Sequence, residues 1–166
     1  GTQVTPISAV AHKLMNNASI MYLNISGNTV SLQDAHLLAS VFAKNFAIKK
    51  LHLTDNKMGG REASVLFESF KNNRTIAELF CGTNAIGDVG ATALSSLLEI
   101  NGSLRRVDIS NNGIGSTGGT ALANALAKNK HVQELNLSYN MLGSDAGCRV
   151  AAAIKDNPAL EKLNIA

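Results

Sequence analysis

Aliphatic residues recur along this chain at intervals of 28 residues, without a gap or an insertion. The first column of equivalent positions comprises Leu23, Leu51, Leu79, Val107, Leu135 and Leu163. A second column follows two residues later and comprises Ile25, Leu53, Cys81, Ile109, Leu137 and Ile165. Because a fixed period of roughly 20 to 50 residues is typical of repeat proteins, we interpret the chain as a stack of similar structural units.

Within each unit, the pattern predicts a strand, a turn and a helix. The alternation of the two aliphatic columns predicts a short strand with one buried face. An asparagine follows each strand, where its side chain can bond backbone groups as the chain turns, at Asn28, Asn56, Asn84, Asn112 and Asn140. Glycine then follows at Gly59, Gly87, Gly115 and Gly143, where we expect tight backbone geometry. Apolar residues at helical spacing, such as Leu94, Leu97 and Leu98, predict the helix.

The helix ends carry signals of their own. A further asparagine column lies where the predicted helices end and comprises Asn17, Asn45, Asn73, Asn101, Asn129 and Asn157. Because asparagine tolerates the left-handed conformation that closes many helices, we expect left-handed caps there. At the start of the chain, Thr5 and Pro6 predict the N-cap and first residue of a helix over residues 6–16.

The repeating consensus is L-x-x-L-x-L-x-x-N-x-L, as in LNLSYNMLGSDAG at residues 135–147. This consensus resembles the leucine-rich repeat family over nearly the whole chain. A 28-residue unit with a helix is similar to the ribonuclease-inhibitor-like subclass of that family. The resemblance implies an α/β solenoid of right-handed βα repeats, with a curved parallel sheet on the concave face and helices on the convex face.

The period also predicts the unit boundaries. We expect a partial repeat over residues 1–22, full repeats over 23–50, 51–78, 79–106, 107–134 and 135–162, and the start of a further strand over 163–166. Solenoids need polar capping units, and we recognise none, so we expect the chain to be a fragment of a longer protein. An uncapped strand can pair with another chain, which leaves self-association through the repeat ends as an alternative.

Composition and charge narrow the class of partner. The chain has 166 residues, of which 45% are hydrophobic, and lacks a membrane-length apolar run, so we expect a soluble array without a membrane segment. The net charge of +3 arises in residues 1–50, where Lys13, Lys44, Lys49 and Lys50 face only Asp34. There is no dense basic stripe, which argues against nucleic-acid binding.

The two cysteines, Cys81 and Cys148, lie 67 residues apart, with no CxxC motif. This spacing favours neither a zinc site nor a disulfide framework, and it is typical of a reducing, cytoplasmic location.

Candidate chemistry is sparse. Residues 113–118 match the motif G-x-G-x-x-G of dinucleotide-binding proteins. We interpret this match as repeat geometry, because Gly115 and Gly118 occupy the columns of Gly87 and Gly90. The four histidines fall in different columns, with no triad or metal cluster. We therefore expect no cofactor, no metal and no enzymatic activity.

Residues beside the buried strand positions are predicted to face the concave side. One such column alternates in charge and comprises Tyr22, Lys50, Glu78, Arg106, Glu134 and Lys162. Parallel strands would place these opposite charges side by side, either as a self-satisfied ladder or as determinants of partner specificity. The other column comprises Asn24, His52, Phe80, Asp108, Asn136 and Asn164.

Phe80 is the exception in its polar column. It can anchor a partner side chain, and the alternatives are that it stacks on His52 or is covered by a flanking domain. The candidate partner-binding residues are Tyr22, Lys50, His52, Glu78, Phe80, Arg106, Asp108 and Tyr139.

These features predict a non-enzymatic scaffold that binds a protein or peptide partner on its concave face. The family resemblance leaves two alternatives. One is a regulator resembling the GTPase-activating proteins of this repeat class, for which Arg61 is the arginine near a strand-to-helix turn. The other is an actin-binding module resembling tropomodulin, in which similar repeats end in an amphipathic helix that we do not find in this sequence.

Overall fold

Helices and strands alternate along the chain, as the periodic pattern predicts. The computed structural model describes residues 7–155 and 157–166. The helices are α1 (Ile7–Leu14), α2 (Leu32–Phe42), α3 (Gly60–Phe70), α4 (Gly87–Ile100), α5 (Ser116–Lys128) and α6 (Gly143–Lys155). The strands are β1 (Tyr22–Asn24), β2 (Lys50–His52), β3 (Glu78–Phe80), β4 (Arg106–Asp108), β5 (Glu134–Asn136) and β6 (Lys162–Asn164). The N-cap and helix start predicted at Thr5 and Pro6 lie outside the described residues.

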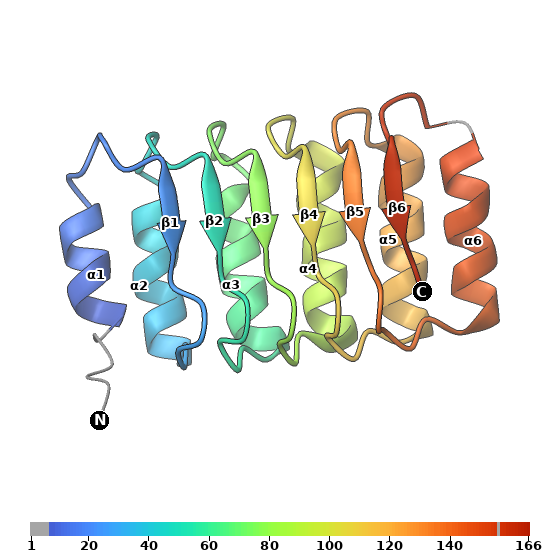
Figure 1. The fold of residues 1–166 in the computed structure, drawn as a ribbon, viewed down its shortest axis with the longest axis horizontal. Helices are drawn as coiled ribbons and strands as arrows, with labels where there is room; N and C mark the ends of the chain where they lie inside the picture. The colour runs from blue at the N-terminus through green and yellow to red at the C-terminus, as the bar shows by residue number, and fades with distance from the viewer. Residues whose placement is uncertain (1–6, 156) are drawn as a thin grey trace.

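The strands form one six-stranded parallel sheet in the order β1-β2-β3-β4-β5-β6. Each strand pairs with the next in a register that joins equivalent positions of successive units, as Leu23 with Leu51 and Leu51 with Leu79. Figure 1 shows the strands as one row in front of a row of helices. The helices therefore cover one face of the sheet, and we call the opposite face the open face.

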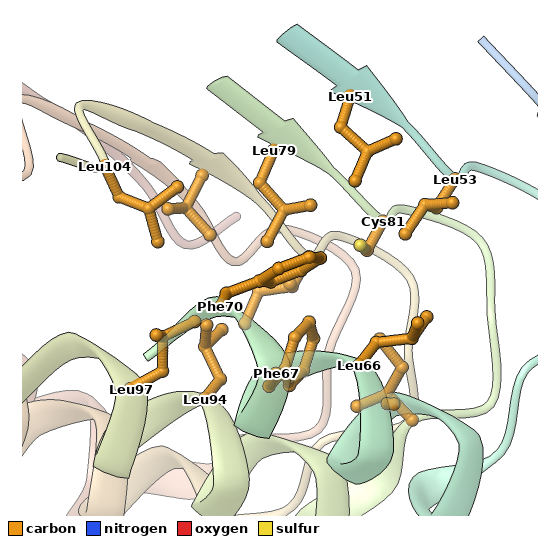
Figure 2. Packing of buried hydrophobic residues seen from close by; sticks show 14 of the residues in the cluster. Leu51, Leu53, Leu66, Phe67, Phe70, Leu79, Cys81, Leu94, Leu97 and Leu104 are labelled. Atoms are coloured by element: carbon orange, nitrogen blue, oxygen red, sulfur yellow. The ribbon is translucent and has the colours of Figure 1, made fainter. Parts of the chain in front are cut away.

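The core fills the layer between the sheet and the helices. In β2 to β5, the middle residue is buried and its two neighbours are half-buried, as the alternation of a strand requires. Figure 2 shows Phe70 of α3 directed toward Leu79 of β3 and Cys81 directly after it, with Phe67 of the same helix on the other side of Phe70. None of these four side chains is more than 1% exposed. The aliphatic columns are therefore the core, as predicted.

Apolar side chains are less buried toward the two ends of the array. Ile20 and Ile165 are 39% and 48% exposed, whereas their equivalents in the inner units are buried. Leu160 and Leu163 are half-buried. Each unit of a solenoid packs only on its neighbours, so a terminal unit has one packing partner fewer.

The asparagine after each strand joins two units. Asn84 Nδ2 donates to the carbonyl of Leu53 in the preceding unit at 3.0 Å, and to that of Cys81 at 2.9 Å. Its Oδ1 accepts from the N–H groups of Asn56 at 2.9 Å and Met58 at 3.1 Å. The predicted bonding of the turn is confirmed. Asn56 departs from the pattern, because its own Nδ2 has no hydrogen-bond partner in the described structure.

The asparagines at the helix ends are not left-handed, so that prediction is wrong. Asn101 has φ −84° and ψ 122°, and Asn129 has φ −71° and ψ 132°, both extended. Hydrogen bonds from their side chains, rather than a left-handed backbone, complete the helix ends. Asn101 Nδ2 donates to the carbonyls of Phe70 and Asn73 in the preceding unit, both at 3.0 Å. Carbonyls near the end of the preceding helix, which lack partners within it, are satisfied in this way.

Equivalent left-handed positions lie in the turns after β1 to β5. They are Gly27, Asp55, Thr83, Asn111 and Tyr139, with φ from 51° to 73°. In each turn this residue donates its N–H to the next unit, as Thr83 does to the Ser110 carbonyl at 2.9 Å. The left-handed turn therefore extends the ladder of backbone hydrogen bonds beyond the strands.

Glycine is favoured in the column before the helices for two different structural reasons. Gly87 and Gly143 are left-handed, with φ of 57° and 71°, as the expectation of tight geometry requires. Gly59 and Gly115 are extended. At Gly115, a side chain would meet a carboxylate oxygen of Asp88 at 3.2 Å, so close approach rather than backbone conformation favours glycine there.

The helix-end asparagines give a test of what holds the units together. Asn73 is 1% exposed and its Nδ2 donates to the carbonyls of Phe42 and Asn45. Asn73→Ala should lower the free energy of unfolding by about 3 kcal/mol, because it leaves buried backbone groups without partners. Urea unfolding followed by circular dichroism measures this change.

The neighbouring Asn72→Ala is the matched control, because Asn72 is exposed on the same loop. We expect it to change the free energy of unfolding by no more than about 0.5 kcal/mol. Equal stabilities for the two alanine variants would show that the buried side chain does not join the units.

Candidate functional site

Charged side chains from adjacent strands form a continuous series of ion pairs on the open face. Lys50 Nζ of β2 lies 3.2 Å from Glu78 Oε2 of β3. Arg106 of β4 lies between two carboxylates, 3.6 Å from Glu78 and 2.6 Å from Glu134. Lys162 Nζ of β6 lies 2.8 Å from Glu134 Oε1. We call these five residues the charge ladder; the alternation of sign predicts its arrangement correctly.

Glu134 is the most strongly held member of the charge ladder. Hydrogen bonds from Arg106 Nε at 2.6 Å and Lys162 Nζ at 2.8 Å lower the pKa of Glu134 to about 2. The same bond to Glu134 raises the pKa of Arg106. The side chains of Glu134 and Lys162 are 25% and 70% exposed, so water and salt screen these pairs. The ladder therefore adds little to stability and satisfies its charges internally.

Three rings lie together on the first three strands. His52 stacks on Phe80, with ring centres 4.2 Å apart and an angle of 14° between the rings. Tyr22 is tilted against His52 at 5.3 Å. Lys50 Nζ lies 5.1 Å from the centre of the Phe80 ring and 5.9 Å from that of Tyr22. We call Tyr22, Lys50, His52 and Phe80 the aromatic cluster; in it, Phe80 stacks on His52 and both remain half-buried.

The environment of His52 favours an uncharged ring. Desolvation by burial is the main cause that lowers the pKa of His52, and Lys50 lowers it further, while Glu78 opposes them. Its Nε2 has no hydrogen-bond partner in the described part of the chain. These surroundings therefore favour the neutral ring, which stacks on Phe80 and leaves Lys50 as the cation of the aromatic cluster.

Phe80 also borders a shallow groove of ≈ 360 Å³ that extends across the open face to β6. Asp108 lies in its wall. One carboxylate oxygen of Asp108 accepts from the Ser110 N–H at 2.9 Å and hydroxyl at 2.7 Å, and the other from Asn136 Nδ2 at 3.1 Å. Asp108 is thus fixed in place by its own neighbours and shapes the groove.

The groove adds residues that the sequence-based selection left out. Its lining includes Glu134, Asn136, Lys162 and Asn164 beside Phe80. All four lie in the two columns predicted to face this side of the sheet. The column pattern was therefore the signal that could have identified them.

The structure brings together most of the predicted site and leaves one residue apart. Glu78, Arg106 and Asp108 continue the surface that begins at the aromatic cluster. Tyr139 lies in the turn after β5, 79% exposed and left-handed at φ 57°. Because β5 is two strand spacings from β3, or about 10 Å, Tyr139 does not belong to the aromatic cluster.

The glycine motif at residues 113–118 binds a carboxylate of the chain itself. Asp88 Oδ1 of α4 accepts from the N–H groups of Gly115 at 2.7 Å and Gly118 at 2.9 Å. The start of α5, where a dinucleotide-binding motif would place a phosphate, is therefore occupied by Asp88. This contact agrees with the interpretation of the motif as repeat geometry.

The remaining candidate groups are placed as follows. Cys81 is fully buried, and burial, with a further contribution from Asp108, raises the pKa of its thiol, so the thiol stays protonated. Arg61 is exposed at the second residue of α3. Within residues 7–155 and 157–166, no group of three or more His, Cys, Asp or Glu is placed to hold a metal ion. None of the described helices is long and apolar enough to cross a membrane.

Comparison with known proteins identifies the repeats. The family model for the leucine rich repeat matches residues 101–123 and 128–147. The structure of leiomodin-1 actin-binding site 2 is similar, with a TM-score of 0.79 and 17% identity, over 91% of this chain and 88% of that one. The tropomodulin C-terminal domain from Caenorhabditis elegans is similar with a TM-score of 0.75 and 17% identity, over 91% of this chain and 92% of that one.

Comparison with curated protein sequences gives no match. At the identities found among the solved structures, the likeness shows the fold alone. The chain therefore contains leucine-rich repeats, and its fold is the predicted α/β leucine-rich repeat solenoid. Leucine-rich repeat arrays typically serve as scaffolds for protein interaction.

The charge ladder gives a pH-dependent test. The pKa of Glu134 is about 2 in the folded chain, against an ordinary value of 4.5. A carboxyl group with a lowered folded-state pKa contributes stability above its unfolded pKa, and this is lost as the pH falls through the folded value. We expect the wild-type chain to lose stability relative to Glu134→Gln between pH 4.5 and about pH 2, as thermal unfolding over a pH series would measure.

Glu161→Gln is the matched control, because Glu161 is an exposed carboxylate outside the charge ladder. That variant should follow the wild-type pH dependence. A constant difference between wild type and Glu134→Gln across the whole series would contradict the role assigned to the ladder.

Proposed function

We propose that this chain is a non-enzymatic interaction module that binds a protein or peptide partner on the open face. We assign it to the ribonuclease-inhibitor-like subclass, because its units repeat every 28 residues and each full unit contains a helix. The proposed units are those that the period delimits, from residue 23 to residue 162. Both cysteines are free, which fits a cytoplasmic location.

The aromatic cluster is the observation that carries the proposal. It combines a stacked pair of rings, an exposed tyrosine and a lysine ammonium on the open face. Aromatic residues in partly desolvated positions are the side chains that most often dominate protein interfaces. The adjacent charge ladder is internally paired, so it would contribute orientation and selectivity rather than most of the affinity.

The proposal predicts that capture of a partner depends on the aromatic cluster. We would immobilise the wild-type array and a variant carrying Phe80→Asp and His52→Ala, and compare the proteins that each retains from a cell lysate. Proteins that bind the open face should be lost from the variant, because a buried carboxylate opposes their docking.

Val89→Asp is the matched control, since Val89 is 64% exposed on α4, away from the open face. This variant should retain the same proteins as the wild type. Circular dichroism must show all three chains folded. Equal retention by wild type and the Phe80 and His52 variant would place the function elsewhere.

Actin is a second candidate partner. Leiomodin-1 actin-binding site 2 and a tropomodulin domain share this fold over most of the chain. The fold similarity supports an actin-binding module as the alternative to an unrelated protein partner. The other alternative, a regulator of GTPases, has only the exposed position of Arg61 in its favour.

Binding to actin is directly measurable. If the alternative is correct, the chain should sediment with actin filaments or shift monomeric actin on a native gel at micromolar concentrations, which are ordinary for transient interactions. The Phe80→Asp variant then shows whether the open face is responsible. A chain that stays in the supernatant and leaves monomeric actin unshifted would exclude actin and leave the interaction module with a different partner.

A further inference from the structure

Exposed apolar side chains gather on the loops that lead from helix to strand in the first two units. Phe46, between α2 and β2, is 62% exposed. Met15, Ile20 and Met21, between α1 and β1, are 38%, 39% and 56% exposed. These loops lie along the upper edge of the array in Figure 1, beside the open face.

The exposure of Phe46 is not the result of a missing neighbour. Its loop is joined to the loop before it by a bond from Asn45 Nδ2 to the Asn17 carbonyl, at 2.9 Å. It is joined to the loop after it by a bond from Asn73 Nδ2 to the Asn45 carbonyl, at 3.1 Å. With neighbouring loops on both sides, Phe46 still projects into solvent.

The loop also holds Phe46 in a defined position. Asn45, immediately before it, is 4% exposed. Asn45 Oδ1 accepts from the N–H groups of Ala47 at 3.0 Å and Ile48 at 3.1 Å, immediately after Phe46. A side chain presented by an anchored loop loses less conformational freedom when it binds, which favours affinity.

Positive charge surrounds these apolar side chains. Lys13, Lys44 and Lys49 are exposed, and none forms an ion pair with the described residues. Asp34 is the only acidic residue before position 51. It lies in the first turn of α2, at the opposite end of that helix from Phe46, and bonds to Ser31.

Favourable interaction with helix dipoles accounts for Lys13 near the end of α1 and Lys44 after the end of α2, but not for the apolar residues beside them. In two later units, the helix-end lysines are neutralised, because Lys71 pairs with Glu68 and Lys128 with Glu99. The first two units therefore combine uncompensated positive charge with exposed apolar surface.

A groove of ≈ 330 Å³ separates the two loops, and Met15, Ala18, Lys44 and Phe46 are among its lining residues. Its volume falls in the range of sites that accept a small apolar group. The groove is an open depression between two loops, with room for one inserted side chain.

We propose that Met15, Met21, Phe46, Lys13, Lys44 and Lys49 form a loop-edge surface that binds an acidic segment of a partner protein. The segment places an apolar side chain in the groove beside Phe46, while its carboxylates face the three lysines. Charge complementarity determines this choice of partner, because the surface offers three cations and no anion. The inference is separate from the open-face proposal, since it uses none of the aromatic cluster.

A displayed library of random peptides tests the chemistry of the partner. Selection on the wild-type chain, with removal of peptides that also bind Phe46→Ser, should enrich peptides that combine Asp or Glu with a large apolar residue. Enrichment of basic or purely polar peptides would overturn the proposal, as would a failure of Phe46→Ser to change which peptides are retained.

Fluorescence anisotropy with one selected peptide then measures how much Phe46 and the lysines each contribute to its affinity. Phe46→Ser should weaken binding about tenfold, as loss of an anchoring side chain does. The double variant Lys44→Glu and Lys49→Glu should weaken it at least as much and reduce its dependence on salt. Because all three side chains are exposed, these variants should fold as the wild type does.

The controls separate this surface from the rest of the molecule. Val89→Ser removes an exposed apolar side chain elsewhere, and Lys130→Glu reverses a charge on a loop of a later unit. Both should leave affinity within about twofold, as surface changes away from an interface do. Phe80→Asp should also leave the peptide bound, even if it abolishes open-face binding.

An anionic membrane is the other source of negative charge that this surface could bind, and vesicles containing phosphatidylserine test it. The proposal expects no sedimentation with these vesicles, or sedimentation that Phe46→Ser does not alter. Vesicle binding that requires Phe46, together with no selected acidic peptide, would replace the protein partner with a membrane.

Discussion

The hydrogen bonds from buried asparagine side chains to the backbone of the preceding unit are the interaction on which the array depends. Asn101 illustrates the reason: its Nδ2 satisfies two carbonyls of the unit before it, while its Oδ1 accepts from the N–H groups of Ser103 and Leu104, which lead into its own strand. A helix end that cannot bond within its own unit is completed by the next unit, and buried backbone groups without partners are costly. Each unit therefore needs its successor, which makes the array cooperative and its spacing uniform.

The residues that hold the units together are largely separate from those on the open face, so the open face is available to bind a partner. The aliphatic columns form the core, and the asparagines supply side-chain bonds that join the units. Residues beside the buried strand positions are not needed to fill the core. Some of them bond the following turn, as Asp108 does by accepting from the Ser110 N–H, but their residue type still differs from strand to strand. The result is a change in character along the sheet, from stacked rings at Tyr22, His52 and Phe80 to paired charges from Glu78 to Lys162. Because paired, exposed charges interact weakly, the rings are the part of the face best suited to hold a partner.

Features that depend on a residue type repeated at equivalent positions could be predicted from the sequence, whereas features that depend on a single residue could not. Strand pairing, the core and the charge ladder follow from the 28-residue period, because each rests on a residue type repeated at equivalent positions. The left-handed turn position was not predictable, since Gly27, Asp55, Thr83, Asn111 and Tyr139 share no residue type there. The extended backbone of the helix-end asparagines was also missed, because the same residue suits a left-handed cap or a side-chain bridge. The positions equivalent to Phe46 share no residue type, so the repeat pattern does not single it out; they are Ala18, Arg74, Gly102, Lys130 and Pro158.

The loop-edge surface and the aromatic cluster meet at the first residues of two strands. Met21 directly precedes Tyr22 of β1, and Lys49 directly precedes Lys50 of β2. Both surfaces therefore meet at the first two strands, and a partner large enough to cover one can also contact the other. Two modest contacts held at a fixed distance bind together more tightly than either does alone, because the second forms at high effective concentration. The aromatic cluster on the first three strands and the exposed Lys44 and Lys49 beside it therefore both support the proposal that a partner is recognised by the first units of the array.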